Sequence, residues 1–146
     1  MEKILISACL VGDNVKYNGG NNLSSKIDAL LEKYELVPFC PEVEGGLPIP
    51  RHPSEQKDGR VINDLNEDVT DHFERGAELA YNICLYLKIK KAILKERSPS
   101  CGVHEIYDGT FSHTVIPGSG VTAALLKRKG ITVYSEDEIP KLLDLD

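Results

Sequence analysis

The sequence has no long hydrophobic run, no excess of positive charge and no internal repeat, linker or low-complexity segment. A membrane-spanning helix needs about 20 consecutive apolar residues, so we expect no membrane partner. The formal net charge is −6, whereas a general nucleic-acid binder needs a basic surface to neutralise phosphates. The length of 146 residues is that of one domain, and we predict a single domain over residues 1–146.

The sequence also gives no pattern typical of a secretory signal. The apolar stretch at residues 4–11 is short, contains Ser7 and runs directly into Gly12 and Asp13. We therefore expect a cytoplasmic protein. A domain of this size needs no disulfide for stability, and in the reducing cytosol its four cysteines are more often metal ligands or catalysts than disulfide partners.

Three of the four cysteines follow short apolar runs that are typical of β-strands. These are residues 4–6 before Cys9, residues 36–39 before Cys40, and residues 92–94 before Cys101. Helical patterns separate the runs, which predicts an α/β fold: a mostly parallel, Rossmann-like sheet flanked by helices. Parallel strands end at one edge of a sheet, where open α/β sheets bind ligands. We therefore expect the three thiols to meet in one crevice.

Apolar residues recurring with the helical period predict the helices. A first helix begins near Ser24 or Ser25 and has an apolar face made of Ile27, Leu30, Leu31 and Tyr34. A second spans residues 71–88 and has an apolar stripe made of Phe73, Ala77, Ala80, Cys84 and Leu87. Because Cys84 belongs to this stripe, we interpret it as a buried core residue and not as a ligand.

The end of the chain contains a helix, a strand and a last short helix in this prediction. A glycine-rich stretch at residues 117–120 leads into a helix that stops at Gly130, and such an entry can hold an anion on its free N–H groups. Residues 131–134 form a fourth strand. Ser135 and Glu138 then have the spacing of a capping box.

Three loops are candidates for function. Residues 11–22 form a polar loop that contains glycine. Residues 41–53 contain four prolines and two glycines, which excludes a helix interior or a central strand. We expect irregular structure from residue 40 to residue 60, which in a small domain is typical of a functional loop. Residues 105–111 contain the Asp-Gly signal of a tight hairpin turn.

Three thiols in one crevice permit three kinds of chemistry. They can hold a 4Fe-4S cluster at three corners and leave one iron open as a Lewis acid, or bind zinc together with His104. Alternatively, one thiol is a nucleophile and another resolves it. The separations of 31 and 61 residues match no compact metal motif, so spacing does not choose among them. Pro41 and Pro99 stiffen the loops, which suits a site of preset geometry.

Several longer motifs resemble domain-of-unknown-function family 523, whose characterised members are bacterial thiouracil desulfidases. The resemblance extends from residue 4 to residue 134. It rests on the sequences at residues 7–12 (SACLVG), 16–20 (KYNGG), 40–51 (CPEVEGGLPIPR), 68–70 (DVT), 94–102 (LKERSPSCG), 107–111 (YDGTF) and 118–123 (GSGVTA).

The resemblance implies a cofactor and a catalytic pair. The cofactor is a 4Fe-4S cluster with three-cysteine ligation and one open iron, and the implied ligands are Cys9, Cys40 and Cys101. The implied catalytic residues are Glu44 and Ser98. Many relatives carry another cysteine where this chain has Val15, which favours three ligands over four.

The implied reaction is non-redox hydrolysis of a carbon–sulfur bond in a thiolated pyrimidine of the thiouracil or 4-thiouridine type. In this hypothesis Glu44 activates water, Ser98 relays a proton, and sulfide leaves as oxygen replaces it. The acidity of the chain favours a small-molecule substrate over a thiolated tRNA.

Substrate contacts and the alternatives remain open on sequence alone. Tyr17 and Asn18 could stack on and hydrogen-bond a pyrimidine, and Arg51 could pair with Glu55 or bind a polar substrate group. A zinc-bearing hydrolase or structural zinc module with His104 is the alternative, and a binding domain with a scaffolding or sensing cluster is a third class.

Overall fold

The protein, described here by a computed structural model over residues 1–144, is built on a parallel four-stranded sheet. The strand order is β2-β1-β5-β8, and the strands are β1 (Glu2–Ser7), β2 (Tyr34–Phe39), β5 (Lys91–Leu94) and β8 (Thr132–Ser135). Each neighbouring pair is parallel. The predicted α/β class with a parallel sheet is therefore confirmed, and the strand order, which the sequence left open, is now known.

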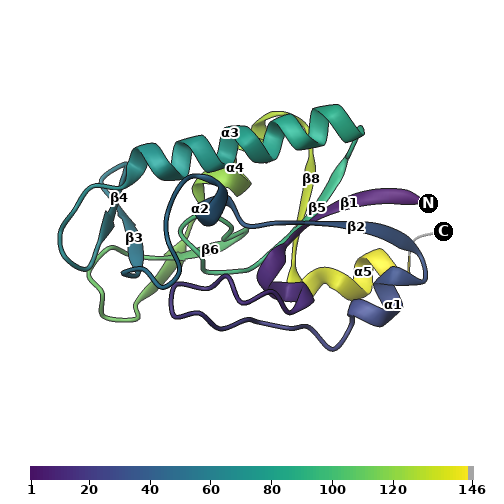
Figure 1. The fold of residues 1–146 in the computed structure, drawn as a ribbon, viewed down its shortest axis with the longest axis horizontal. Coiled ribbons are helices and arrows are strands. Elements are labelled where there is room, and N and C mark those ends of the chain that lie inside the picture. The colour runs from purple at the N-terminus through teal and green to yellow at the C-terminus, as the bar shows by residue number, and fades with distance from the viewer. Residues whose placement is uncertain (145–146) are drawn as a thin grey trace.

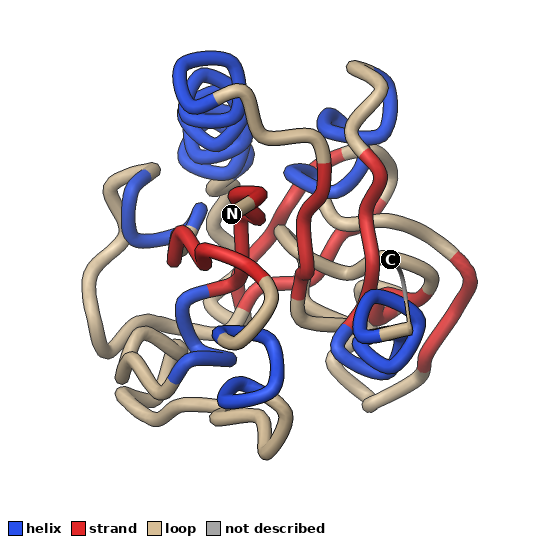
Figure 2. Tube along the Cα trace, turned by 90° about the vertical axis from the view of Figure 1, so that its right-hand side faces the viewer, coloured by secondary structure: helices blue, strands red, loops and turns tan. Residues whose placement is uncertain are grey.

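Helices cover both faces of the sheet (Figures 1 and 2). One face carries α3 (Thr70–Leu87) and α4 (Val121–Arg128), and the other carries α1 (Ile27–Leu31) and α5 (Ile139–Leu143). β1 is buried on both sides: Leu5 packs into the α3 and α4 layer, whereas Ile4 and Ile6 pack into the α1 and α5 layer. Alternate side chains of a strand point to opposite faces, so an almost unbroken apolar run is what this central strand requires.

Two antiparallel hairpins and three short helices complete the described fold. The hairpins are β3 (Ser54–Lys57) with β4 (Arg60–Asn63), and β6 (Glu105–Tyr107) with β7 (Val115–Pro117). The short helices are η1 (Ala8–Val11), α2 (Pro41–Glu44) and η2 (Glu136–Glu138). Figure 1 shows the first hairpin at the end of the molecule away from the N-terminus. No helix in residues 1–144 has the length and apolarity required to span a membrane.

The first helix is shorter than its sequence pattern predicts. α1 ends at Leu31, and Tyr34 begins β2 instead of continuing the helical face. The Tyr34 side chain still enters the core, where its hydroxyl donates a hydrogen bond of 2.9 Å to the Leu142 carbonyl in α5. Tyr34 is therefore buried, as the helical pattern predicted, but it is buried from a strand and against α5.

The proline-rich stretch is more regular than predicted. Pro41 begins α2, where a missing N–H costs no hydrogen bond. Further on, β3 and β4 are joined by Asp58 and Gly59, whose φ angles of 51° and 77° are those of a two-residue hairpin turn. The prediction of irregular structure from residue 40 to residue 60 was therefore wrong at both ends.

The second Asp-Gly pair does not make the predicted tight turn. Residues 108–114 form a longer loop between β6 and β7. The N–H groups of Gly109 and Phe111 both donate to Glu55 Oε1, at 3.0 and 3.1 Å. This carboxylate is 9% exposed, so the loop is held against β3 instead of closing on itself.

Elsewhere, the predicted burial of Cys84 and the Ser135–Glu138 capping box are confirmed.

Candidate functional site

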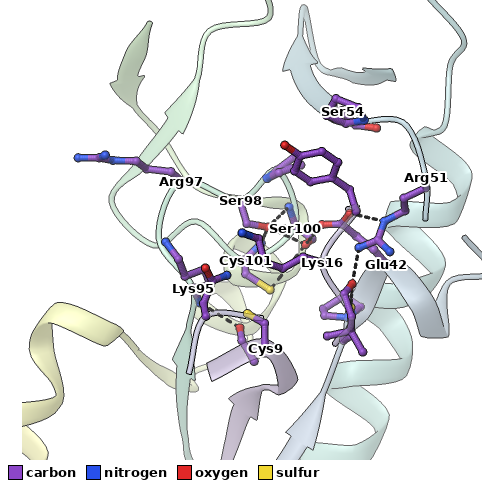
Figure 3. Close-up of a pocket in the computed structure, with 18 of the residues that line it drawn as sticks. Cys9, Lys16, Glu42, Arg51, Ser54, Lys95, Arg97, Ser98, Ser100 and Cys101 are labelled. Carbon is purple, nitrogen blue, oxygen red and sulfur yellow. Dashed lines mark hydrogen bonds and ion pairs between the residues drawn. The ribbon is translucent and has the colours of Figure 1, made fainter. Parts of the chain in front are cut away.

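A cavity of about 610 Å³ opens at the carboxyl edge of the sheet, and the three predicted thiols line it together. Cys9 lies in η1 after β1, Cys40 is the N-cap of α2 after β2, and Cys101 lies in the loop after β5. Figure 3 shows the side chains of Cys9 and Cys101 entering this cavity. In the β1–β2 pairing Ser7 is opposite Phe39, so both strands end level and deliver their cysteines to one place.

The loop that carries Cys101 is fixed by backbone hydrogen bonds to the start of α4. The first N–H groups of this helix donate to the carbonyls of Pro99 and Ser100, at 3.0 and 2.8 Å. Gln56 in β3 donates to the Pro99 carbonyl from outside, at 3.1 Å. The glycine-rich entry to α4 therefore holds the Cys101 loop through the N–H groups that we had considered for an anion.

The carboxylate of Glu96 holds the other side of the same loop. It is 8% exposed, and its Oε1 accepts N–H groups from Val103, His104 and Glu105 at 2.7 to 3.0 Å. Burial by itself raises the pKa of Glu96, but these hydrogen bonds outweigh it and hold the pKa below its ordinary value. The segment that follows Cys101 is thus wrapped around an ionised carboxylate.

Among the cavity thiols, Cys101 is buried and Cys9 and Cys40 are half-buried. Burial raises the pKa of Cys9 and of Cys40, and raises that of Cys101 to about 12. Burial by itself therefore disfavours the thiolate form, which both a nucleophilic cysteine and a metal-ligating cysteine use. Hydrogen-bond donors act against burial at each sulfur: Asn22 at Cys9, the backbone N–H groups of Val43 and Glu42 at Cys40, and Ser7 and Ser100 at Cys101.

This donor set fits an iron–sulfur cluster better than a single metal ion. Thiolates are the usual ligands of such clusters, and hydrogen bonds to the sulfurs tune them. Within residues 1–144, no three His, Cys, Asp or Glu side chains are arranged to hold one ion. A cluster distributes its ligands around several irons and does not require them to converge on one point. The three cysteines are free of disulfides, so all three sulfurs can serve as ligands.

His104 is not part of this cavity. Its Nε2 is paired with Glu138, and both side chains line a separate cavity beside η2. The predicted alternative of a zinc site made from the three cysteines and His104 therefore has no geometric basis, because its fourth ligand is engaged elsewhere.

Of the two glutamates of α2, Glu42 lies in the cavity and Glu44 does not. Glu44 is exposed and does not line the cavity, whereas Glu42 does. Glu42 Oε1 accepts a hydrogen bond of 3.1 Å from Arg51, and the side chains of this ion pair are only 15% and 7% exposed. Of the two roles considered for Arg51, the ion pair is made with Glu42 and not with Glu55, which holds the loop after β6. The other role, binding of a polar substrate group, stays a prediction, and Arg51 lines the cavity.

Two serines complete this polar group (Figure 3). Ser100 Oγ lies 2.7 Å from Glu42 Oε2 and 2.9 Å from Ser98 Oγ. Ser98, predicted from the sequence, lines the cavity and is half-buried. The sequence prediction gave the catalytic role to Glu44 and not to Glu42, because the proline-rich stretch gave no sign of the helical turn that orients Glu42. The nearest signal was its position directly after Cys40 and Pro41.

The remaining predicted residues divide between cavity and surface. Tyr17 lines the cavity, but Asn18 does not: its Oδ1 accepts the Gly20 N–H at 2.9 Å and so closes its own loop. The cavity also has lining residues that the sequence did not single out, among them Lys16, Asn22, Lys95, Tyr107, Phe111 and His113.

Comparison with known proteins places this site in a family. The family model described as 2-thiouracil desulfurase matches residues 4–138. The uncharacterized protein YbbK of Bacillus subtilis (strain 168) is 41% identical over 150 residues, covering 96% of this chain and 99% of that protein. A solved structure of the [4Fe-4S]-dependent thiouracil desulfidase TudS (DUF523Vcz) is 49% identical, with a TM-score of 0.92 over 97% of this chain and 95% of that one. The chain therefore belongs to the 2-thiouracil desulfurase family.

Proposed function

We propose that the protein is a 4Fe-4S-dependent desulfidase that replaces the sulfur of a thiolated pyrimidine with oxygen and releases sulfide. The observation that carries this proposal is that three thiols and a hydrogen-bonded Glu42, Ser98 and Ser100 group share one cavity at the sheet edge. The family membership and the 49% identical [4Fe-4S]-dependent desulfidase support it.

In this proposal Cys9, Cys40 and Cys101 hold the cluster. When bound, a cluster with three cysteine ligands supplies one iron that is open to the soft sulfur of a thiocarbonyl group and polarises its carbon–sulfur bond. The cavity volume of about 610 Å³ is in the usual range for ligand sites, and it leaves room for a pyrimidine ring beside the thiols.

The protein side chains handle water and protons. Of the two glutamates of α2, only Glu42 lines the cavity, so in this proposal the general base is Glu42 and not Glu44, which the resemblance implied. Arg51 fixes one carboxylate oxygen and leaves the other directed at the serines. Ser98 stands at the cavity end of this group, where it can exchange a proton with water or with the ring.

The overall reaction is a hydrolysis. One carbon–sulfur double bond is exchanged for a carbon–oxygen double bond, one water is consumed, and the sulfur leaves as hydrogen sulfide. No net electron transfer is needed, so the proposed enzyme requires neither an oxidant nor a reductant. The net charge of −6 favours a small thiolated pyrimidine over a thiolated tRNA as substrate.

The test is cluster content together with turnover, on protein purified without oxygen. We expect about four irons and four acid-labile sulfides per chain, and conversion of 2-thiouracil to uracil with release of sulfide. In water enriched in oxygen-18, the product should carry the heavy isotope. Cys9→Ser, Cys40→Ser and Cys101→Ser should each lose iron and activity, whereas Cys84→Ala should keep both. Zinc in place of iron, or uracil without the heavy isotope, would overturn the proposal.

A further inference from the structure

We propose that Ser100 is a proton relay that connects Ser98, at the cavity surface, to the Glu42 carboxylate. This inference rests on the proposed hydrolytic function. Ser98 and Glu42 are the groups placed to act on substrate and water, yet the direct hydrogen bond between them is long. Ser98 Oγ lies 3.5 Å from Glu42 Oε2, which is long for a hydrogen bond between two oxygens.

Ser100 bridges this gap with two shorter hydrogen bonds. Its Oγ lies 2.9 Å from Ser98 Oγ and 2.7 Å from Glu42 Oε2. Both distances are close to the usual value for oxygen–oxygen hydrogen bonds. A proton that moves from Ser98 to the carboxylate therefore has a continuous path through Ser100 and no comparable direct path.

The hydrogen bonds also have one consistent direction. The Ser100 hydroxyl donates its single proton to Glu42 Oε2. Ser98 Oγ accepts the N–H groups of Ser100 and Cys101, at 3.2 and 3.1 Å. Its own proton is then free to point at Ser100 Oγ. The chain of donors therefore runs from Ser98 through Ser100 to Glu42, which is the direction in which a general base removes a proton.

Burial separates the roles of the two serines. Ser98 is half-buried, so its hydroxyl can be reached from the cavity, whereas Ser100 is 1% exposed. Bulk water has little access to the middle of the path. The competing acceptor for the Ser100 proton is Cys101 Sγ, but it lies 3.6 Å away, well beyond the carboxylate.

The proton balance of the step is simple. A water molecule in the cavity gives a proton to Ser98 Oγ as Ser98 passes its own proton to Ser100 and Ser100 passes its own to Glu42. One O–H bond of water breaks, one O–H bond forms on the carboxylate, and both serines end as hydroxyls. The reverse transfer returns the proton to the products and regenerates the carboxylate of Glu42.

The decisive experiment compares Ser100→Thr with Ser100→Val, because these side chains have nearly the same shape and only threonine keeps a hydroxyl. On cluster-loaded protein, the valine variant should lower kcat for 2-thiouracil about 100-fold and leave KM within about twofold. The threonine variant should recover most of the lost kcat. Iron and sulfide content and the absorption spectrum should equal those of the wild type in both variants.

Ser100→Ala is a second variant without the hydroxyl. It covers the case in which the methyl group that valine and threonine add disturbs the packing around this buried position. Ser112→Ala is the matched control, since Ser112 Oγ is also hydrogen-bonded to a hydroxyl, that of Thr114, but is exposed. A solvent isotope experiment adds a readout of the path itself. When kcat is plotted against the deuterium fraction of the solvent, the wild type should give a curve, because several protons move together, and Ser100→Ala should give a straight line.

Three outcomes would overturn the relay. They are a kcat above half of the wild-type value in Ser100→Ala, equal losses in the valine and threonine variants, or a loss of activity that follows a loss of iron. An inactive wild type with an intact cluster would instead contradict the proposed function, so the two failures are distinguishable.

Discussion

Ser100 Oγ and Glu42 Oε2 are joined by a hydrogen bond of 2.7 Å across 58 positions of the sequence. This bond ties the start of α2 to the loop after β5. Each of these segments brings a thiol and hydrogen-bonding oxygens into the cavity: Cys40 comes with Glu42, and Cys101 comes with Ser98 and Ser100. The positions of two of the three proposed cluster ligands and of the proton-handling groups are therefore set by the same two segments of backbone.

Separate substitutions of Glu42 and Glu44 test which of the two glutamates acts in the reaction. Glu42→Gln should lower kcat by at least about 100-fold, because a general base is lost, while the iron content stays at the wild-type level. Glu44→Gln should keep kcat within about twofold, because Glu44 is exposed and does not line the cavity. The measurement is sulfide release from 2-thiouracil by cluster-loaded protein. Loss of activity in the Glu44 variant alone would contradict the assignment of Glu42.

Removal of Arg51 should destabilise the fold. Its guanidinium pairs with Glu42 while 7% exposed, and breaking a buried ion pair from one side leaves an uncompensated charge at a cost of about 3 kcal/mol. Arg51→Met should lower the free energy of unfolding by about this amount in urea titrations. Arg60→Met is the control, because the Arg60–Asp68 pair is 53% and 42% exposed and should contribute less than about 1 kcal/mol. Equal effects of the two variants would contradict this account.

Gly76 in α3 is a close contact between this helix and the segment bearing Cys40. A Cβ atom at this position would lie 1.9 Å from the Pro41 carbonyl oxygen, so Gly76→Ala must push α2 away. We expect a loss of about 3 kcal/mol in unfolding free energy and a reduced iron content, because Cys40 moves with α2. Urea unfolding and iron analysis measure both effects. Glu74→Ala, an exposed position on the same helix, should leave both unchanged; wild-type iron content in Gly76→Ala would contradict the prediction.

Acid should remove a stabilising contribution made by Glu138. Burial raises the pKa of this carboxyl group, but hydrogen bonds from His104, the Ser135 N–H and Lys141 outweigh it and lower the pKa from 4.5 to about 2. A lowered pKa stabilises the fold fully above pH 4.5, and this contribution is lost as the pH falls towards 2.

The fall in the pKa of Glu138 corresponds to about 3 kcal/mol. Glu138→Gln should therefore be less stable than the wild type at pH 7 by about this amount, with the difference shrinking towards pH 2. Urea midpoints measured across this range give the result. Glu35→Gln, in an exposed pair with Lys3, should show no comparable change. A constant gap between wild type and Glu138→Gln at all pH values would contradict the account.

The two glutamates of α2 show why the sequence located the site but not all of its side chains. The motif around Cys40 predicted an acidic residue in the right loop, but Glu42 and Glu44 are two positions apart. In a helical turn this places them on nearly opposite faces. Which face meets the cavity depends on how α2 packs against α3 at Gly76, and no local pattern reports that contact.

A similar limit applies to the two Asp-Gly pairs. Both have the composition of a two-residue turn, yet only the pair at Asp58 and Gly59 closes one. At Gly109 the backbone N–H instead donates to Glu55, 54 positions away. Local propensity was the same in both places, and a buried carboxylate from another hairpin decided the result.

Sequence patterns were enough to predict the α/β class, the parallel sheet, the burial of Cys84 and the meeting of three thiols at one edge. These features follow from the periodic placement of apolar residues, which sets which strands are buried and where they end. The folded structure was needed to learn four further features: the strand order, the pairing of Arg51 with Glu42, the separation of His104 from the thiols, and the chain of hydrogen bonds from Ser98 to Glu42. Those features depend on contacts between distant loops, and the geometry of such contacts comes from packing and not from local sequence patterns.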